Sequence, residues 1–280
     1  MKQIRAASSR LNPEELRREA MRPVAVGLVA TSERGYSELE DFLVPPEMLR
    51  ERRTEILENV HRAGDRNAAA QVDLVLYEAG LPSPQGAFRH WPEDPQQTVK
   101  EILDEHEELS LPLARRFPAF RKTVVDRIVQ AVARENALFA VTTALPNIVP
   151  SLLELPWALG EFASDTIFLT VNQIRMTFMI AAACGAEVSF GQQKLEIGAI
   201  AASAFGWRAI ARELAGKIPL GGGLIPKGAI AYAGTYLIGK GLERLHHAGA
   251  PYTAEEREEV YRQGYQRGTA IAESLSKEAS

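Results

Sequence analysis

The chain has 280 residues, of which 46% are hydrophobic and 24% are charged, with 32 Lys and Arg against 36 Asp and Glu. This composition excludes a disordered chain, a collagen and a simple repeat protein, and the net charge of −4 provides no overall attraction to nucleic acid. The single cysteine, Cys184, excludes a disulfide framework and any metal site built from several cysteines.

The charged N-terminus has no apolar run before a small-residue cleavage site, so we expect no secretory signal and a cytoplasmic start. Asn12 and Pro13 are an N-cap and a first-turn proline, which predict a short helix over 13–21. Residues 24–29 (VAVGLV) form a β-prone run that leads through a turn into a helical sequence, and 72–78 (VDLVLYE) is a second candidate buried strand.

The loop after the first strand can be aligned with the phosphate-binding pattern G-x-x-x-x-G-K-[ST] at Ala30, Gly35, Tyr36 and Ser37. Alanine replaces the first glycine, and tyrosine replaces the lysine that reaches the β- and γ-phosphates. Two interpretations stay open: a degenerate nucleotide-binding loop, or an ordinary strand-to-helix turn. We favour the turn.

Residues 79–95 are rich in Pro and Gly and are predicted to be an irregular linker. Asp94 then caps a helix predicted over 95–113, whose acidic face includes His106. Because no second histidine follows at helical spacing, we expect a solvated face and no metal site. Residues 115–134 carry six basic side chains against Asp126 alone, a local charge of +5, with valines and isoleucines on one helical face. Such a helix suits an anionic bilayer surface or, equally, packs on a soluble core.

Charge is sparse in the next segment, because residues 137–241 hold 13 charged side chains in 105 while the other 175 residues hold 55. Its longest charge-free stretch, 136–153, just reaches transmembrane length. Pro146 and Pro150 interrupt this stretch and Pro156 follows it, so a kinked or interfacial segment is favoured over a straight spanning helix. Trp157 then opens a helix predicted to end near Gly185.

Polar side chains align on that helix. Glu161, Asp165 and Asn172 fall on one face at about 100° per residue, with Arg175 beside them. We interpret this stripe as a wet face or a helix-pairing surface, with an ion path along Glu161, Asp165 and Arg175 as the alternative.

Further helices are predicted over 192–215, 229–245 and 254–276. The first two are separated by a glycine- and proline-rich break with a tight turn at Gly221, Gly222 and Gly223. Thr253 and Glu256 form a capping box for the last helix, where Gly264, Gly268 and Ala272 make a small-residue groove for packing within the chain or in a dimer.

The proline-broken apolar entry, the IP-x-G break and the AYAGTY-x-IG closing helix resemble the helical domain of the YcjF-type family of unknown function, over residues 137–270. The resemblance implies association with the cytoplasmic membrane and with an Era-like GTPase partner. It also makes the N-terminal α/β element a candidate GTPase remnant.

We therefore predict a mainly α fold, a helical bundle of small-residue-rich helices with a small α/β N-terminal element. We divide the chain into four segments. Residues 1–94 are the charged N-terminal region with the α/β element and the linker, and residues 95–136 form an acidic and then a basic helix. Residues 137–250 form the weakly charged helical domain, and residues 251–280 form the capped C-terminal helix.

The leading functional hypothesis is a non-enzymatic, mostly helical protein whose weakly charged domain inserts in or lies on the anionic cytoplasmic membrane, with both charged ends in the cytoplasm. The alternatives are a soluble helical module or homo-oligomer in the cytoplasm, and a degenerate nucleotide-binding protein. No motif identifies a catalytic residue, a cofactor site or a nucleic-acid partner.

Overall fold

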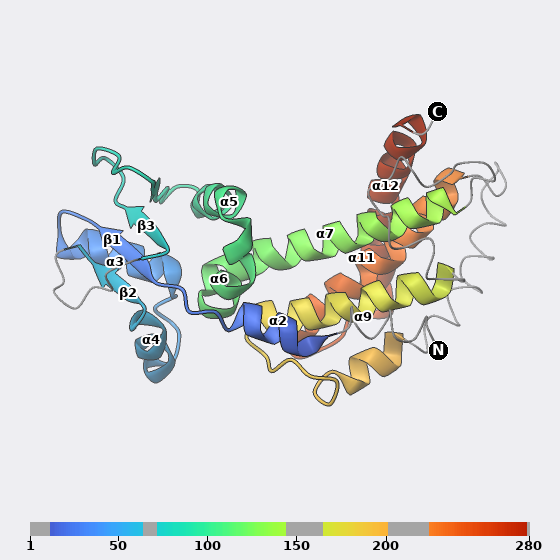
Figure 1. Cartoon of the computed structure of the whole chain (residues 1–280), viewed down its shortest axis with the longest axis horizontal. Coiled ribbons are helices and arrows are strands. Elements are labelled where there is room, and N and C mark those ends of the chain that lie inside the picture. The colour runs from blue at the N-terminus through green and yellow to red at the C-terminus, as the bar shows by residue number, and fades with distance from the viewer. Residues whose placement is uncertain (1–11, 64–71, 144–164, 201–223, 279–280) are drawn as a thin grey trace. The chain divides into compact units, whose positions relative to one another are not determined.

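The structure is a computed structural model that describes residues 12–63, 72–143, 165–200 and 224–278 (Figure 1). Over these residues the fold is mainly helical with a small parallel sheet, which confirms the predicted fold class. The chain divides into two compact units. We call Arg17–Asp126 with Ala182–Ala186 the α/β unit, and residues 1–16, 127–181 and 187–280 the helical unit.

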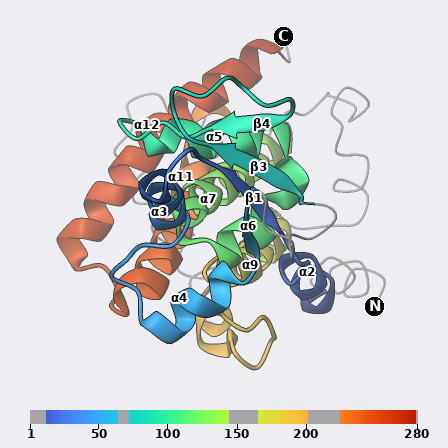
Figure 2. The same ribbon diagram turned by 90° about the vertical axis from the view of Figure 1, so that its left-hand side faces the viewer.

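The α/β unit contains a parallel sheet with the strand order β2-β1-β3-β4. Val26 lies opposite both Val60 and Leu74, and Val75 lies opposite Ala87. Figure 2 shows β1, β3 and β4 next to one another. The strands are short: β1 Val26–Val29, β2 Val60–Arg62, β3 Leu74–Tyr77 and β4 Ala87–Arg89. The predicted strands at 24–29 and 72–78 are therefore confirmed.

Three of the described helices of this unit contact the sheet: α3 Glu33–Leu43, α4 Arg50–Leu57 and α5 Pro95–Glu105. The short 3₁₀ helix η1 Glu107–Leu109 and helix α6 Ser110–Arg116 follow α5, and α2 Pro13–Ala20 precedes the sheet in the chain. As predicted, the Asn12 side chain accepts a hydrogen bond from the Glu14 backbone N–H, and Asp94 accepts one from Gln97. The core includes side chains that are entirely buried, among them Leu28, Leu43, Leu76, Ile102 and Leu113.

Two sequence predictions in this region need correction. The predicted linker over 79–95 contains strand β4, in which Phe88 is buried while its two neighbours are half-buried. The helix predicted over 95–113 is broken at His106, whose backbone leaves the helical region with φ −121° and ψ 62°. The chain then continues as η1 and α6.

Long helices form the helical unit: α7 Pro118–Thr142, which begins in the α/β unit, α9 Asp165–Ala183, α11 Leu224–Ala248 and α12 Ala254–Glu278. The capping box of α12 is confirmed, because Thr253 N–H donates to Glu256 and Glu256 N–H donates to the Thr253 hydroxyl. The predicted small-residue groove packs within the chain: a Cβ on Gly268 would lie 2.7 Å from the Cβ of Tyr232 on α11.

The apolar side of the basic stretch 115–134 faces protein. Its valines and isoleucine are buried, namely Val124, Val125, Ile128, Val129 and Val132. The stretch comprises the end of α6 and the first half of α7, and the buried side chains of α7 agree with the interpretation in which it packs on a core. Its association with a membrane stays a prediction.

Candidate anion-binding site

The loop aligned with the phosphate-binding pattern lies between β1 and α3. Ser32 caps α3, and its hydroxyl accepts a hydrogen bond from Gly35 N–H at 3.1 Å. Glu78, directly after β3, accepts hydrogen bonds through Oε2 from the Thr31 N–H at 2.9 Å and the Thr31 hydroxyl at 3.0 Å. A carboxylate of the chain thus lies at the head of α3, where helix N-termini commonly hold phosphate.

Gly35 and Tyr36 have structural roles in this loop. A Cβ on Gly35 would lie 2.7 Å from the Glu78 carboxylate, so the glycine makes room for that side chain. Tyr36, at the position of the pattern's lysine, has the Arg62 guanidinium 5.0 Å from its ring centroid. Arg62 also pairs with Glu33 and Glu40. Ala30 and Ser37 complete the loop, and nucleotide binding there stays a prediction.

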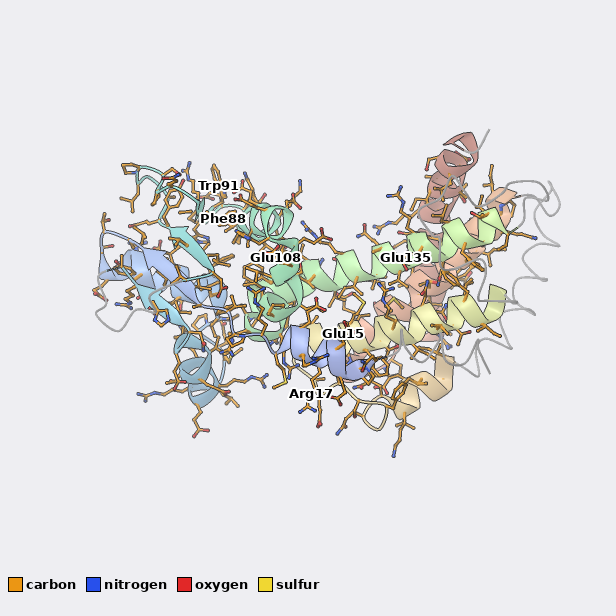
Figure 3. All side chains as sticks on the ribbon, in the orientation of Figure 1. Glu15, Arg17, Phe88, Trp91, Glu108 and Glu135 are labelled. Carbon is orange, nitrogen blue, oxygen red and sulfur yellow. The ribbon has the colours of Figure 1, made fainter. Side chains whose placement is uncertain are left out.

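The predicted polar stripe lies partly inside the helical unit. Asn172 is 2% exposed and donates to Asn136 Oδ1 on α7 at 2.9 Å, so at this position the stripe pairs helices and is not a wet face. Arg175 lies 3.7 Å from the carboxylate of Glu135, which Figure 3 labels on α7. Gln173, which the helical spacing placed off the stripe, is also buried and donates to Thr235 on α11.

Other predicted positions lie outside the part of the chain that the structure describes. These are Pro146, Pro150, Pro156, Trp157, Glu161, Gly221, Gly222 and Gly223, together with the side chain of Asp165.

An arginine-rich cavity of about 520 Å³ lies wholly within the α/β unit, and we call it the arginine pocket. Its arginines come from four parts of the chain: the segment after α2, helix α4, helix α6 and the first turn of α7. They are Arg22, Arg52, Arg115, Arg116 and Arg121, and the acidic residues in the wall are Glu51 and Glu55. The pocket therefore carries a formal charge of +3, in a chain whose total is −4.

Two of these arginines are fixed by backbone carbonyls. Arg115 donates through Nη1 to the carbonyl of Ala182 at 3.3 Å and that of Ala186 at 2.8 Å. Arg121 donates through Nε to Ala114 O at 3.0 Å and through Nη2 to Arg115 O at 3.2 Å. Carbonyls orient these guanidiniums without neutralising them, so their positive charge is available to a ligand.

Gly185 lies where two guanidiniums converge. It follows α9 with φ +80°, a conformation that favours glycine, and it lines the pocket. The Nη2 atoms of Arg52 and Arg121 each lie 3.7 Å from the place that a Cβ on Gly185 would occupy. The absence of a side chain at this residue keeps the space between the two arginines open.

Burial and neighbouring positive charges both disfavour the charged form of two arginines in the pocket. Burial lowers the pKa of the Arg115 guanidinium, and the positive charges of Arg17 and Arg116 lower it further. Burial also lowers the pKa of Arg121; the Cys184 thiol opposes this shift, and the positive charges of Arg52 and Arg115 add to it. A bound anion would relieve this repulsion, and guanidiniums hold phosphate and carboxylate oxygens with two hydrogen bonds each.

A second hollow of about 840 Å³ lies beside β4. Figure 3 labels Phe88 and Trp91, which line it together with Glu101, Asp104 and Glu105. The Arg89 guanidinium lies 4.1 Å from the Trp91 ring centroid, so one face of that ring already carries a cation of the chain. With three acidic residues in its wall, this hollow does not fit an anion.

Part of the arginine pocket is visible in the sequence. Arg115, Arg116 and Arg121 belong to the basic stretch 115–134, for which the sequence leaves a bilayer surface and a soluble core equally open, whereas no sequence pattern points to Arg22 or Arg52. The +5 charge of residues 115–134 was the available signal for an anionic ligand.

Within the described ranges, no helix combines the length and apolar character needed to cross a bilayer. Over the same residues, no three His, Cys, Asp or Glu side chains come together as metal ligands. No protein-family model, curated protein or solved structure matches the chain. The resemblance to the YcjF-type family stays a prediction.

Proposed function

We propose that the chain acts by binding and not by catalysis, and that the arginine pocket takes a phosphate group at the cytoplasmic face of the membrane. The phosphate belongs to a lipid headgroup or to a soluble phosphate ester, and both present the same oxygens to the arginines. The observation that carries the proposal is the convergence of Arg52 and Arg121 over Gly185, in a cavity with three further arginines.

The size and chemistry of the cavity support this proposal. A volume of about 520 Å³ falls within the range of small-ligand pockets, which is roughly 300–1,000 Å³. Among the described residues, Arg52 and Arg116 have no carboxylate within ion-pairing distance, so an incoming phosphate does not have to displace a partner of either one. The membrane location comes from the sequence, through the weakly charged segment and the family resemblance.

The test compares two arginines of the same helix. Titrating inorganic phosphate and glycerol phosphate into the full chain by calorimetry should give saturable binding, and Arg52→Gln should weaken it about tenfold, or ~1.4 kcal/mol. Arg50→Gln removes the same charge from an exposed position of α4 that does not line the pocket, and should leave affinity unchanged. If both variants lose the same affinity for phosphate, the binding comes from general charge attraction, and the proposed phosphate site in the pocket is wrong.

Vesicle flotation distinguishes the two sources of phosphate. If the ligand is a lipid headgroup, the chain floats with phosphatidylglycerol vesicles, and Arg52→Gln with Arg116→Gln reduces the floated fraction. Binding of glycerol phosphate without flotation assigns the site to a soluble ester and removes the membrane from the proposal.

A soluble helical interaction module is the second candidate function. The buried apolar face of residues 115–134 and the packing of α12 on α11 favour it, because both surfaces are already covered within the chain. A monodisperse species in detergent-free light scattering, with no vesicle flotation, would select this candidate. The Era-like GTPase partner is a proposal that rests on the family resemblance alone.

A further inference from the structure

The arginine pocket contains acids as well as arginines. Glu51 and Glu55 lie on α4 and line the same cavity as the five arginines. Both are exposed, and in the described part of the chain neither lies within 4.0 Å of an arginine of the pocket. The nearby ion pairs use other carboxylates: Arg53 pairs with Asp41, and Arg22 lies 3.6 Å from Asp73.

Among the residues that the structure describes, the two acids and the arginines thus line one cavity without forming ion pairs with one another, although Arg52 shares helix α4 with both acids. Because Glu51 and Glu55 are four residues apart, their side chains lie on one face of α4. Arg115, Arg116 and Arg121 belong to α6 and to the first turn of α7, and Arg115 and Arg121 are held in place by carbonyls. A site with two acids on one helix and three half-buried cations on others complements a ligand that carries both charges.

We propose that the pocket takes a phosphate ester that also carries a primary ammonium group, as phosphoethanolamine does. The phosphate binds between Arg52 and Arg121, and the ammonium binds the carboxylates of Glu51 and Glu55. This inference rests on the proposed function and names the class of ligand within it. No covalent step is involved.

The test uses two probes that differ in the ammonium group. Phosphoethanolamine and ethyl phosphate share the phosphate and the two-carbon chain, and only the first carries the amine. The full chain should bind phosphoethanolamine at least fivefold more tightly than ethyl phosphate in calorimetry at pH 7. Glu51→Gln combined with Glu55→Gln should abolish this ratio, while the affinity for ethyl phosphate stays the same or rises because negative charge has left the pocket.

A glutamate of α4 outside the pocket provides the matched control. Glu58→Gln removes an acid from the C-cap of α4 that does not line the pocket, and should leave the ratio unchanged. Equal affinity of the wild type for both probes overturns the ammonium site and leaves the phosphate site standing. Binding of neither probe overturns both. Flotation with phosphatidylethanolamine-rich vesicles but not with phosphatidylcholine vesicles identifies a lipid as the source of the ligand, and binding of the soluble probe alone identifies a free ester.

Discussion

Asn136 on α7 donates through Nδ2 to the hydroxyl of Thr235 on α11 at 2.8 Å, and neither residue has any exposed surface. Asn172 on α9 donates to Asn136 Oδ1, and Gln173 on α9 donates to the same Thr235 hydroxyl at 3.3 Å. This chain of hydrogen bonds joins three helices of the helical unit through their interior. Because buried polar groups that lose a partner are costly, the network fixes which helix faces meet.

Thr235→Val tests this network. The substitution removes the acceptor of both Asn136 and Gln173 at nearly constant volume, and should lower the free energy of unfolding by about 1–3 kcal/mol. Urea denaturation followed by circular dichroism measures the change. Asn136→Leu should cost a similar amount, and the double variant should cost less than the sum of the two. Strict additivity would show that the two side chains act independently.

Two glycines of α11 provide a matched pair for close helix packing. A Cβ on Gly239 would lie 2.5 Å from Cγ2 of Val129 on α7, whereas a Cβ on Gly241 would meet nothing within 4 Å. Gly239→Ala should therefore destabilise the helical unit by about 1–3 kcal/mol through overpacking. Gly241→Ala should stabilise it by up to about 1 kcal/mol, because alanine favours the helix interior. Thermal unfolding of the two variants is the measurement, and melting temperatures that shift in the same direction would contradict the packing argument.

The contact between Glu78 and Thr31 is expected to stabilise the turn into α3. Glu78→Ala removes the acceptor of two hydrogen bonds and a negative charge near a helix N-terminus, which should cost about 1–2 kcal/mol. Gly35→Ala should also destabilise the wild type, because its Cβ meets the Glu78 carboxylate. In the Glu78→Ala background the same substitution should be neutral. If Gly35→Ala costs the same in both backgrounds, the glycine is needed for another reason.

Lowering the pH should reduce the free energy of unfolding of the α/β unit, because His90 is buried there and resists protonation. Burial lowers the pKa of this imidazole, which lies 4.6 Å from the Phe42 ring, and the charge of Glu38 opposes the shift. Since the folded pKa is below the ordinary value of about 6.5, the unfolded chain takes up the proton first. The contribution of neutral His90 to stability is therefore fully present above about pH 6.5, and it is lost as the pH falls toward the pKa of the folded state.

Urea titrations between pH 5 and pH 8 measure this dependence, with a slope from His90 of at most about 1.4 kcal/mol per pH unit. His90→Phe keeps an aromatic ring beside Phe42 and should flatten the profile. His246 in the helical unit has a pKa lowered by burial as well, so a residual slope should remain and should disappear in a variant that also carries His246→Phe. A profile that His90→Phe does not change would exclude this residue as the source.

Local signals predicted the helix starts well. Asn12, Asp94 and Thr253 all cap helices as expected, because a cap depends on residues within one turn. Strands β2 and β4 were not predicted, since three residues are too few to show an alternating pattern. Their place in the sheet depends on pairing with β1 and β3, which lie far from them in the sequence or across an irregular loop.

The candidate site was harder to predict than the helix starts, because its residues are brought together only by the tertiary structure. A single helical stripe on α9 included Asn172 and left out Gln173, yet both are buried, because α9 contacts α7 through one and α11 through the other. In the arginine pocket, the basic stretch was visible in the sequence, but Arg52 comes from α4, more than sixty residues before Arg121. Spacing along the chain holds no information on such a convergence.

The pairing of α11 with α12 also bears on the order in which the chain folds. These helices follow one another with only residues 249–253 between them, so Gly268 reaches Tyr232 by closing a short hairpin. In the sheet, Val26 pairs with Leu74, which is 48 residues away, and the chain between them must form a large loop before β1 and β3 can pair. Local contacts form faster than distant ones. We therefore expect the α11–α12 hairpin to gain protection from hydrogen exchange early in refolding, and the sheet to gain it late.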